Sequence, residues 1–240
     1  MSVVPYSVSE GVATVTLNRP ESRNALNLEM CNGLINACKI SCSDESVKVV
    51  FVRAIGPVFC AGADLKERQG MSEAQVRERR MKGFAAYAAL EALPMPAIAV
   101  VQGPVVGSGC EIAGACDFIV ATPEASFRTP EALRGTVGAT QRLPRVLGKR
   151  LAKDMMFTGR TLSAGEAREA GLVSRLVSLS DLESTLEEIK KTILDAPSQS
   201  LRLAKRCIDR GVELDPKGAL GTEIAAIEEQ LAAGSWMGKK

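Results

Sequence analysis

The chain has 240 residues, 46% of them hydrophobic, which is enough to build a substantial core in one domain or in one domain with a small appendage. Its formal net charge of +2 is too small to predict nucleic acid as a partner. The sequence contains no histidine, which excludes Ser-His-Asp and Cys-His catalysis and all histidine-containing metal sites. Acid–base chemistry is therefore left to carboxylates, Lys, Tyr or Cys.

Cysteine usage and the N-terminal segment predict a cytoplasmic protein. The seven cysteines are odd in number and include no C-x-x-C pair, so we expect reduced thiols and neither a zinc site nor a redox couple. Residues 1–6 resemble no signal peptide, and no apolar run approaches the roughly 20 residues that span a bilayer. We therefore expect no metal and no association with a membrane.

The first half of the chain reads mainly as strands with two helices between them. Residues 3–8 and 12–18 alternate around a turn and predict a β-hairpin. Helical spacing predicts helices over 28–41 and 73–92. We expect the remaining strands over 47–54, 97–102 and 118–121, with a glycine-rich turn over 103–109 that leads into a helix starting near Cys110.

Helical patterns dominate after Leu133, over residues 163–170, 181–195, 198–211 and 218–233. Two strands and a helix recur over residues 1–50 and again over 51–120, which suggests stacked ββα turns in an α/β fold. We expect a core with the active site over residues 1–180. A helical C-terminal region, residues 181–240, would pack on the sheet or on a neighbouring subunit.

Two segments, residues 59–66 and 106–111, place glycine and other small residues between a strand and a helix. Such junctions expose backbone N–H groups that favour an oxyanion. Each could instead be only a tight turn that needs positive φ. A dinucleotide fingerprint is disfavoured in the second segment, because Ile112 occupies the position of the required third glycine, and the ending of a phosphate loop is missing as well.

Two glutamates are candidates for acid–base chemistry. Glu111 lies in the first turn of a helix made otherwise of small apolar residues, and Glu131 follows Pro130 at a second predicted helix start. The alternative for each is a carboxylate that complements the helix dipole, worth about 0.3–1 kcal/mol.

Five motifs in order resemble the crotonase (enoyl-CoA hydratase/isomerase) family. They span about residues 3–215 and are Asn18-Arg-Pro-x-x-x-Asn24-Ala-Leu26, Phe59-Cys-Ala-Gly-Ala-Asp-Leu65, Gly107-Ser-Gly-Cys-Glu111 through Cys116-Asp117, Pro130-Glu131 and Thr140-Gln-Arg-Leu-Pro144. The resemblance implies a crotonase-like spiral of stacked ββα turns with a C-terminal helical region. It also implies a homotrimer or homohexamer.

The same resemblance implies an enoyl-CoA hydratase with Glu111 and Glu131 as catalytic residues, Glu131 nearer the substrate Cα and Glu111 nearer the water. The N–H groups of Ala63 and Ser108 would bind the thioester oxygen. Hydratases of the family have both acids, whereas isomerases keep one. Coenzyme A is part of the substrate, so no separate cofactor is expected.

The resemblance also assigns substrate contacts to Asp64, Leu65 and Lys66. Charged side chains at Lys66, Arg19 and Arg23 are candidates for the coenzyme A phosphates, and a solvated surface position is the alternative for the two arginines.

Three other functions stay open. The protein could be an enoyl-CoA isomerase, or a methylglutaconyl-CoA hydratase, which residues 63–68 also resemble. It could instead be a non-catalytic CoA- or RNA-binding protein on the same fold. Two positions depart from the family pattern: Ser108 replaces a glycine, and the 135–140 loop is shorter than usual.

Overall fold

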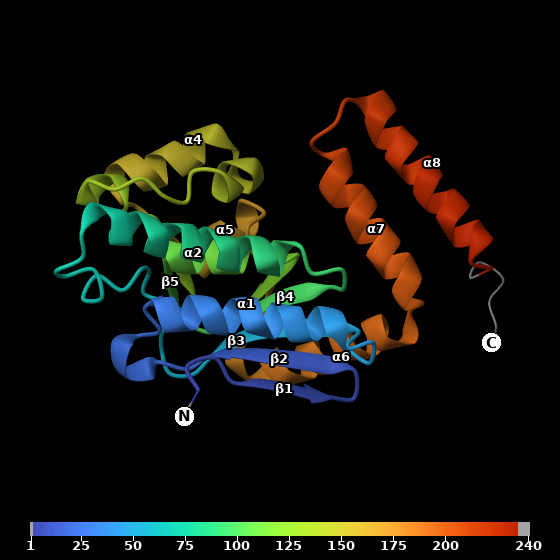
Figure 1. The fold of residues 1–240 in the computed structure, drawn as a ribbon, viewed down its shortest axis with the longest axis horizontal. Helices are drawn as coiled ribbons and strands as arrows, with labels where there is room; N and C mark the ends of the chain where they lie inside the picture. Colours follow the sequence, from blue (N-terminus) through green and yellow to red (C-terminus); the bar gives the residue numbers. More distant parts are fainter. Residues whose placement is uncertain (1, 235–240) are drawn as a thin grey trace.

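A computed structural model describes residues 2–234 of the chain and shows two β-sheets surrounded by helices (Figure 1). The larger sheet has the strand order β1 (Tyr6–Ser9), β2 (Val12–Leu17), β3 (Val49–Ala54), β4 (Ala97–Val101), β6 (Phe118–Ala121) and β9 (Arg175–Leu176). The smaller sheet has the order β5 (Pro104–Val106), β7 (Ser126–Arg128) and β8 (Thr161–Ser163).

The larger sheet begins with the predicted hairpin and continues as parallel strands. β1 and β2 pair antiparallel around Glu10 and Gly11, whose φ values of 49° and 78° suit a tight two-residue hairpin turn. From β2 onward each neighbouring pair in this sheet is parallel. Parallel pairing needs a crossover between strands, and α1 (Leu28–Ser43) and α2 (Glu73–Glu91) supply the first two.

The second strands of successive turns pair with one another and produce a spiral. An isolated parallel bridge joins Leu26 to Ala63, a second joins Cys60 to Val105, and β5 then pairs with β7. Each ββα turn is thereby stacked on the previous one at two places, in the larger sheet and along this second line. This is the predicted arrangement of stacked ββα turns.

Hydrophobic residues fill both faces of the larger sheet, as is usual for parallel strands. On one face, alternate strand residues pack against α1, α2 and α3 (Ser108–Gly114) in the main core. On the other face, Leu182, Leu186 and Ile189 of α6 (Leu182–Asp195) pack on a second cluster that includes Phe51 and Ile98. The first helix of the predicted C-terminal region therefore packs on the sheet.

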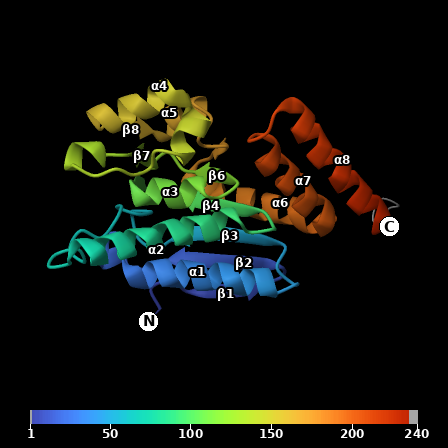
Figure 2. The ribbon, with the colours of Figure 1, turned by 45° about the horizontal axis from the view of Figure 1, so that its top comes forward.

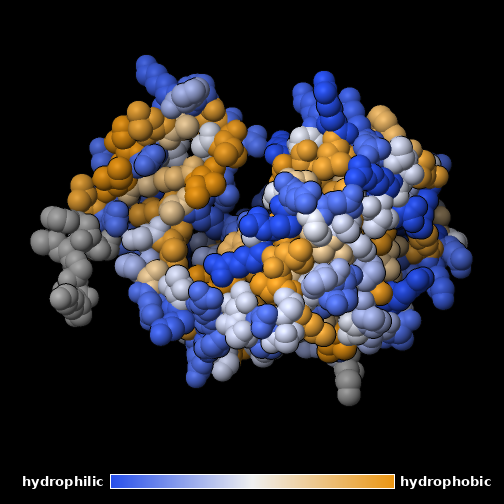
Figure 3. Space-filling model, turned by 180° about the vertical axis from the view of Figure 1, so that it is seen from behind, coloured by the Kyte–Doolittle hydropathy of each residue, from blue (hydrophilic) through white to orange (hydrophobic). Residues whose placement is uncertain are grey.

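Helices α7 (Ser198–Gly211) and α8 (Pro216–Ala232) form an arm that projects away from the sheets (Figure 2). Leu203 and Ala226 are the buried hydrophobic residues of these two helices, whereas several large apolar side chains on them are exposed. The space-filling view shows apolar surface gathered on this arm and a hollow between the arm and the rest of the molecule (Figure 3). Helix α8 ends before the undescribed residues 235–240, on which no expectation is tested.

The structure corrects several expectations about short elements. The segment predicted as a turn over 103–109 contains β5, and the following helix starts at Ser108 rather than near Cys110. The strands β7, β8 and β9 were not predicted, because two or three residues are too few to show a period of two. Helix α4 (Arg142–Thr158) and α5 (Ala164–Glu169) complete the layer beside the smaller sheet. None of the helices within residues 2–234 is long and apolar enough to cross a membrane.

Candidate active site

A cavity of about 170 Å³ lies between the 61–65 loop, α2, the start of α3 and the segment 130–139. Of the residues predicted from the sequence, it is lined by Glu111, Glu131, Ala63, Leu65 and Ser108. Asp64 and Lys66 are not among its lining residues. A larger cleft of about 1150 Å³ separates the arm from α2 and contains neither glutamate, so the smaller cavity is the candidate active site.

The backbone of the 61–65 loop is arranged so that one N–H group is left for a ligand. In the bridge with Leu26, the N–H of Leu26 donates to Gly62 O at 2.8 Å and the N–H of Asp64 donates to Leu26 O at 2.9 Å. Because the bridge uses the groups on either side of Ala63, the N–H of Ala63 itself points away from Leu26. Gly62 adopts φ 98°, a conformation that a residue with a side chain rarely takes.

Ser108 supplies the second predicted N–H group. It is the first residue of α3, where the N–H has no acceptor within the helix. The positive φ of this junction, 52°, belongs to Gly107, so a serine at position 108 fits the helix without backbone strain. The departure from the family's usual glycine at this position is therefore tolerated by the local backbone.

Glu111 is buried in α3 and its carboxylate is held by an arginine. Its Oε2 accepts a hydrogen bond from Arg142 Nη1 at 2.7 Å, and Arg142 Nη2 binds Glu91 Oε2 at 2.5 Å. The guanidinium also lies 5.9 Å from the centre of the Tyr87 ring, within range of a cation–π contact. Arg142 thus fixes the carboxylate and compensates its charge.

Glu131 is partly buried on the other side of the cavity, and its Oε2 has no hydrogen-bond partner among the described residues. Burial raises the pKa of this carboxyl; a backbone hydrogen bond opposes the rise, and the charge of Glu111 adds to it. Gly107 and Gly138 make room for the side chain, since a Cβ at Gly107 would lie 2.3 Å from Glu131 Oε1. The environment therefore favours a protonated Glu131 more than water would.

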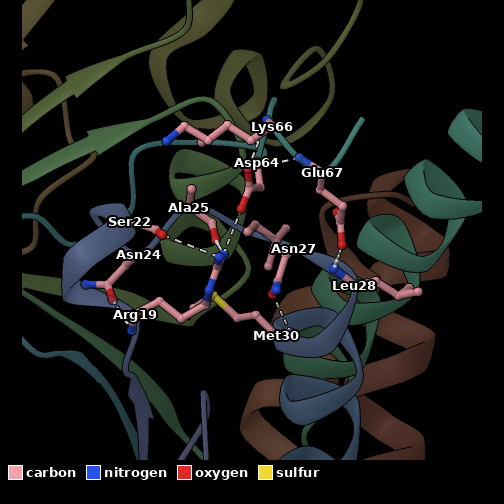
Figure 4. Close-up of polar contacts among 12 residues, drawn as sticks. Arg19, Ser22, Asn24, Ala25, Asn27, Leu28, Met30, Asp64, Lys66 and Glu67 are labelled. Carbon is pink, nitrogen blue, oxygen red and sulfur yellow. Dashed lines mark hydrogen bonds and ion pairs between the residues drawn. The ribbon is translucent and has the colours of Figure 1, made fainter. Parts of the chain in front are cut away.

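The Asp64 side chain is held by hydrogen bonds within the chain (Figure 4), and its predicted contact with the substrate stays a prediction. Its Oδ2 accepts from Arg19 Nη1 at 3.0 Å, and its Oδ1 accepts from the N–H groups of Lys66 and Glu67 at 3.1 and 3.3 Å. Burial acts to raise the pKa of Asp64, but the hydrogen bonds from Arg19 and the backbone hold it below the usual value. These contacts brace the loop that presents Ala63.

The same contacts bear on the residues proposed for the coenzyme A phosphates. Arg19 also donates to Ala25 O at 2.5 Å, so its guanidinium is engaged within the chain rather than displayed to a ligand. Lys66 and Arg23 are exposed, and their role stays a prediction.

Sequence reasoning missed Arg142, Tyr87 and the arginines that line the cavity. Arg142 belongs to the Thr140–Pro144 motif, and that motif is the one sequence feature that could have pointed to it. Nothing in the local sequence shows that its side chain reaches Glu111, which is 31 residues away. Within residues 2–234 no group of three or more Cys, Asp or Glu side chains is placed to hold a metal ion.

Comparisons with known proteins point to one family. A family model described as enoyl-CoA hydratase/isomerase matches residues 7–233. A human relative named enoyl-CoA hydratase domain-containing protein 2, mitochondrial, is 39% identical over 89% of this chain and 76% of its own length. A short-chain-enoyl-CoA hydratase from Clostridium acetobutylicum is 36% identical over 91% of this chain and 85% of its own.

Solved structures extend the likeness to three dimensions. An enoyl-CoA hydratase from Mycobacterium smegmatis superposes with a TM-score of 0.92 at 32% identity, covering 95% of this chain and 91% of that one. An enoyl-CoA hydratase from Bacillus anthracis gives a TM-score of 0.88 at 35% identity, covering 94% and 89%. These neighbours confirm the crotonase fold that the sequence motifs implied.

Proposed function

The chain belongs to the enoyl-CoA hydratase/isomerase family, and on that basis we propose that it adds water across the α,β double bond of an enoyl-CoA thioester. The observation that carries the proposal is the presence of two glutamates with different surroundings in one cavity. Glu111 is bound by Arg142, whereas Glu131 has a buried oxygen without a partner and a raised pKa. Pairs of carboxyl groups in unlike environments are typical of acid–base catalysis.

In the proposed reaction, Glu111 accepts a proton from water as the water oxygen bonds to Cβ of the substrate. The electron pair of the double bond moves towards Cα and the thioester oxygen, which gives an enolate. The Glu131 carboxyl then donates its proton to Cα, and the single bond between Cα and Cβ completes the hydroxyacyl product. A raised pKa suits Glu131 to the donor role.

The N–H groups of Ala63 and Ser108 are proposed to bind the thioester oxygen while it carries negative charge. Both residues line the cavity, and within residues 2–234 neither N–H group donates to another backbone group. Losing one such donor typically costs about 2.7–4 kcal/mol of transition-state stabilisation. No cofactor enters this reaction, because coenzyme A is part of the substrate.

We also propose that the active protein is a homotrimer or homohexamer. The supporting observation is a set of exposed apolar side chains on the arm: Ile208, Leu220, Ile224, Ile227 and Leu231, each about half exposed or more. Burial of such a surface against a second copy would be favourable, whereas a monomer leaves it in water.

Turnover of crotonyl-CoA, followed as loss of the enoyl absorbance, tests the proposal. We expect Glu131→Gln and Glu111→Gln each to lower kcat about 10²–10⁴-fold, because glutamine keeps the shape but cannot exchange a proton. The double variant should lose much less than the product of the single losses, since the two groups act as a unit. Glu169→Gln, an exposed glutamate of α5 outside the cavity, should retain wild-type turnover.

Two results would redirect the assignment. Conversion of a 3-enoyl-CoA to its 2-enoyl isomer without hydration of either would show an isomerase. Absence of any turnover together with salt-sensitive RNA binding would favour the non-catalytic alternative.

A further inference from the structure

Three arginines from different parts of the chain line the same cavity as the two glutamates. Arg68 follows the 61–65 loop, Arg80 lies in α2, and Arg134 ends the short helix η2 (Ala132–Arg134). Arg80 and Arg134 are close enough to Glu131 for their charges to act on its carboxyl. Arg80 is likewise close enough to affect Arg68. All three arginines therefore line one cavity, and Arg80 lies within electrostatic range of both Arg68 and Glu131.

These arginines differ from Arg79, the other arginine in the lining. Arg79 is buried, binds Glu67 Oε2 at 2.9 Å through Nε and donates to Leu26 O through Nη2. Within the described part of the chain, by contrast, Arg68, Arg80 and Arg134 form no ion pair. Arg80 donates to Val137 O, which carries no full charge.

Of the three arginines, Arg68 lacks a hydrogen bond at a buried atom. Its Nε is buried and has no hydrogen-bond partner within residues 2–234. Burial lowers the pKa of this guanidinium, and the positive charges of Arg79 and Arg80 lower it further. The charge of Glu67 opposes this shift, but Glu67 forms its ion pair with Arg79. A further bound anion would offset the repulsion among the guanidinium groups and complete the missing hydrogen bond.

The carboxylates within the lining cannot supply that anion. Glu111 is engaged by Arg142, and Glu131 is the acid of the proposed reaction, whose Oε2 stays without a hydrogen-bond partner. The lining therefore has more positive than negative charge. A planar guanidinium is well suited to binding a carboxylate through two parallel hydrogen bonds.

We propose that Arg68, Arg80 and Arg134 bind a carboxylate at the far end of the acyl group, so that the preferred substrates are enoyl-CoA thioesters with an acidic acyl chain. This inference rests on the proposed function for the site of chemistry. The cavity volume of about 170 Å³ equals roughly six water molecules, which suits a short acyl group and excludes a nucleotide. We therefore assign the anion to a carboxylate of the acyl chain, and the experiment below distinguishes it from a phosphate of coenzyme A.

Two saturated thioesters that cannot be hydrated separate binding from catalysis. Glutaryl-CoA ends in a carboxylate, and 5-methylhexanoyl-CoA carries an isopropyl group of similar shape in its place. By calorimetry we expect the wild-type protein to bind glutaryl-CoA at least about 10-fold more tightly. Arg68→Gln should reduce this preference about 10–100-fold. Arg77→Gln, an exposed arginine of α2 outside the lining, is the matched control and should keep it.

Several outcomes would overturn the inference. Equal affinity of the wild-type protein for the two thioesters would do so, and so would an unchanged preference in Arg68→Gln. If Arg68→Gln instead weakens both thioesters and free coenzyme A equally, the arginine binds coenzyme A phosphate. Should Arg68→Gln fail to fold, Arg134→Gln, at an exposed position, provides the same comparison.

Failure of this inference can be told apart from failure of the proposed function. Glutaconyl-CoA and 5-methylhex-2-enoyl-CoA, the unsaturated counterparts, report hydration. Preference for glutaryl-CoA without hydration of either enoyl thioester would support the carboxylate site and contradict the hydratase. Hydration of both enoyl thioesters with equal kcat/KM would support the hydratase and contradict the carboxylate site.

Discussion

At the scale of single residues, the two candidate catalytic glutamates have the same chemistry and different neighbours. Glu111 accepts a charged hydrogen bond from Arg142, and Glu131 has a buried oxygen with no partner in the described chain. Burial of a carboxyl group disfavours its ionisation unless hydrogen bonds or positive charges compensate for the lost hydration. The position of one arginine is thus a main difference between their surroundings.

The raised pKa of Glu131 predicts a pH-dependent stability. The folded protein holds this proton more tightly than the unfolded chain does, so the free energy of unfolding falls as the pH rises from 4.5, the ordinary value, towards the raised pKa. The glutamine in Glu131→Gln cannot ionise, so the free energy of unfolding of this variant does not decrease for this reason. We therefore expect the Tm of the variant, relative to wild type, to increase as the pH rises through that window in thermal melts. A difference that is flat or shrinks with pH would contradict the shift.

Arg142 provides a second prediction at this scale. Arg142→Met leaves the buried Glu111 carboxylate without its partner, and we expect a loss of about 1–3 kcal/mol in the free energy of unfolding. Glu91→Gln removes the other, more exposed ion pair of Arg142 and should cost about 0–1 kcal/mol. Urea denaturation of both variants measures the two values. Equal losses would mean that Arg142 does not support Glu111 in particular.

At the scale of elements, the site depends on how strands end and helices begin. The 61–65 loop is pinned by the bridge between Leu26 and Ala63 and by the hydrogen bonds to Asp64. The start of α3 is set by Gly107, whose N–H donates to Arg128 O of β7 at 2.8 Å. The strands thereby fix the positions of the 61–65 loop and the start of α3, both rich in small residues, beside the cavity.

Gly107→Ala tests this junction. The φ of 52° would strain an alanine by about 1–3 kcal/mol, and its Cβ would lie 2.3 Å from Glu131 Oε1. We expect loss of stability together with loss of crotonyl-CoA turnover, because the carboxyl must move.

Gly165→Ala is the matched control in α5. A Cβ there meets nothing within 4 Å, and its φ is not in the range that favours glycine. It should be neutral or stabilise the protein by up to about 1 kcal/mol. Full turnover by Gly107→Ala would show that the Glu131 position is not controlled by this glycine.

At the scale of the whole molecule, the arm formed by α7 and α8 stands out because many of its large apolar side chains are exposed. Its helices bury little apolar surface in this chain, while α6, the helix before them, is well packed on the sheet. The predicted division at residue 180 therefore groups together helices that behave differently. That boundary stays a prediction, as does the cytoplasmic location.

The exposed arm predicts the state of assembly. Light scattering should give a mass near three or six times the chain mass of 25.5 kDa. Replacing Ile224 and Ile227 of α8 together by Lys should shift the mass towards that of a monomer, because burying two charges in an apolar interface is costly. Leu179→Lys, an exposed apolar position outside the arm, is the control. A wild-type mass of one chain would refute the proposal.

The sequence alone determined the fold class and most helices and strands, and it proposed the two glutamates as candidates. Apolar periodicity is a local property, so helices of 14–19 residues such as α1, α2, α6 and α7 were predicted close to their observed bounds. The absence of histidine limited the catalytic groups in advance, and five ordered motifs indicated the family. Short strands and the helix start at Ser108 were missed, because a segment of two or three residues is too short to show a periodic pattern.

Tertiary structure alone decided what surrounds each site residue. Hydrogen-bond partners 31 to 45 residues apart, such as Arg142 with Glu111 and Arg19 with Asp64, come from different turns of the spiral and leave no local signal. The same packing collects three arginines around a cavity and leaves Glu131 Oε2 without a partner within the described chain. Burial and charge proximity depend on the distances between these side chains in space, and the order of residues along the chain does not specify those distances.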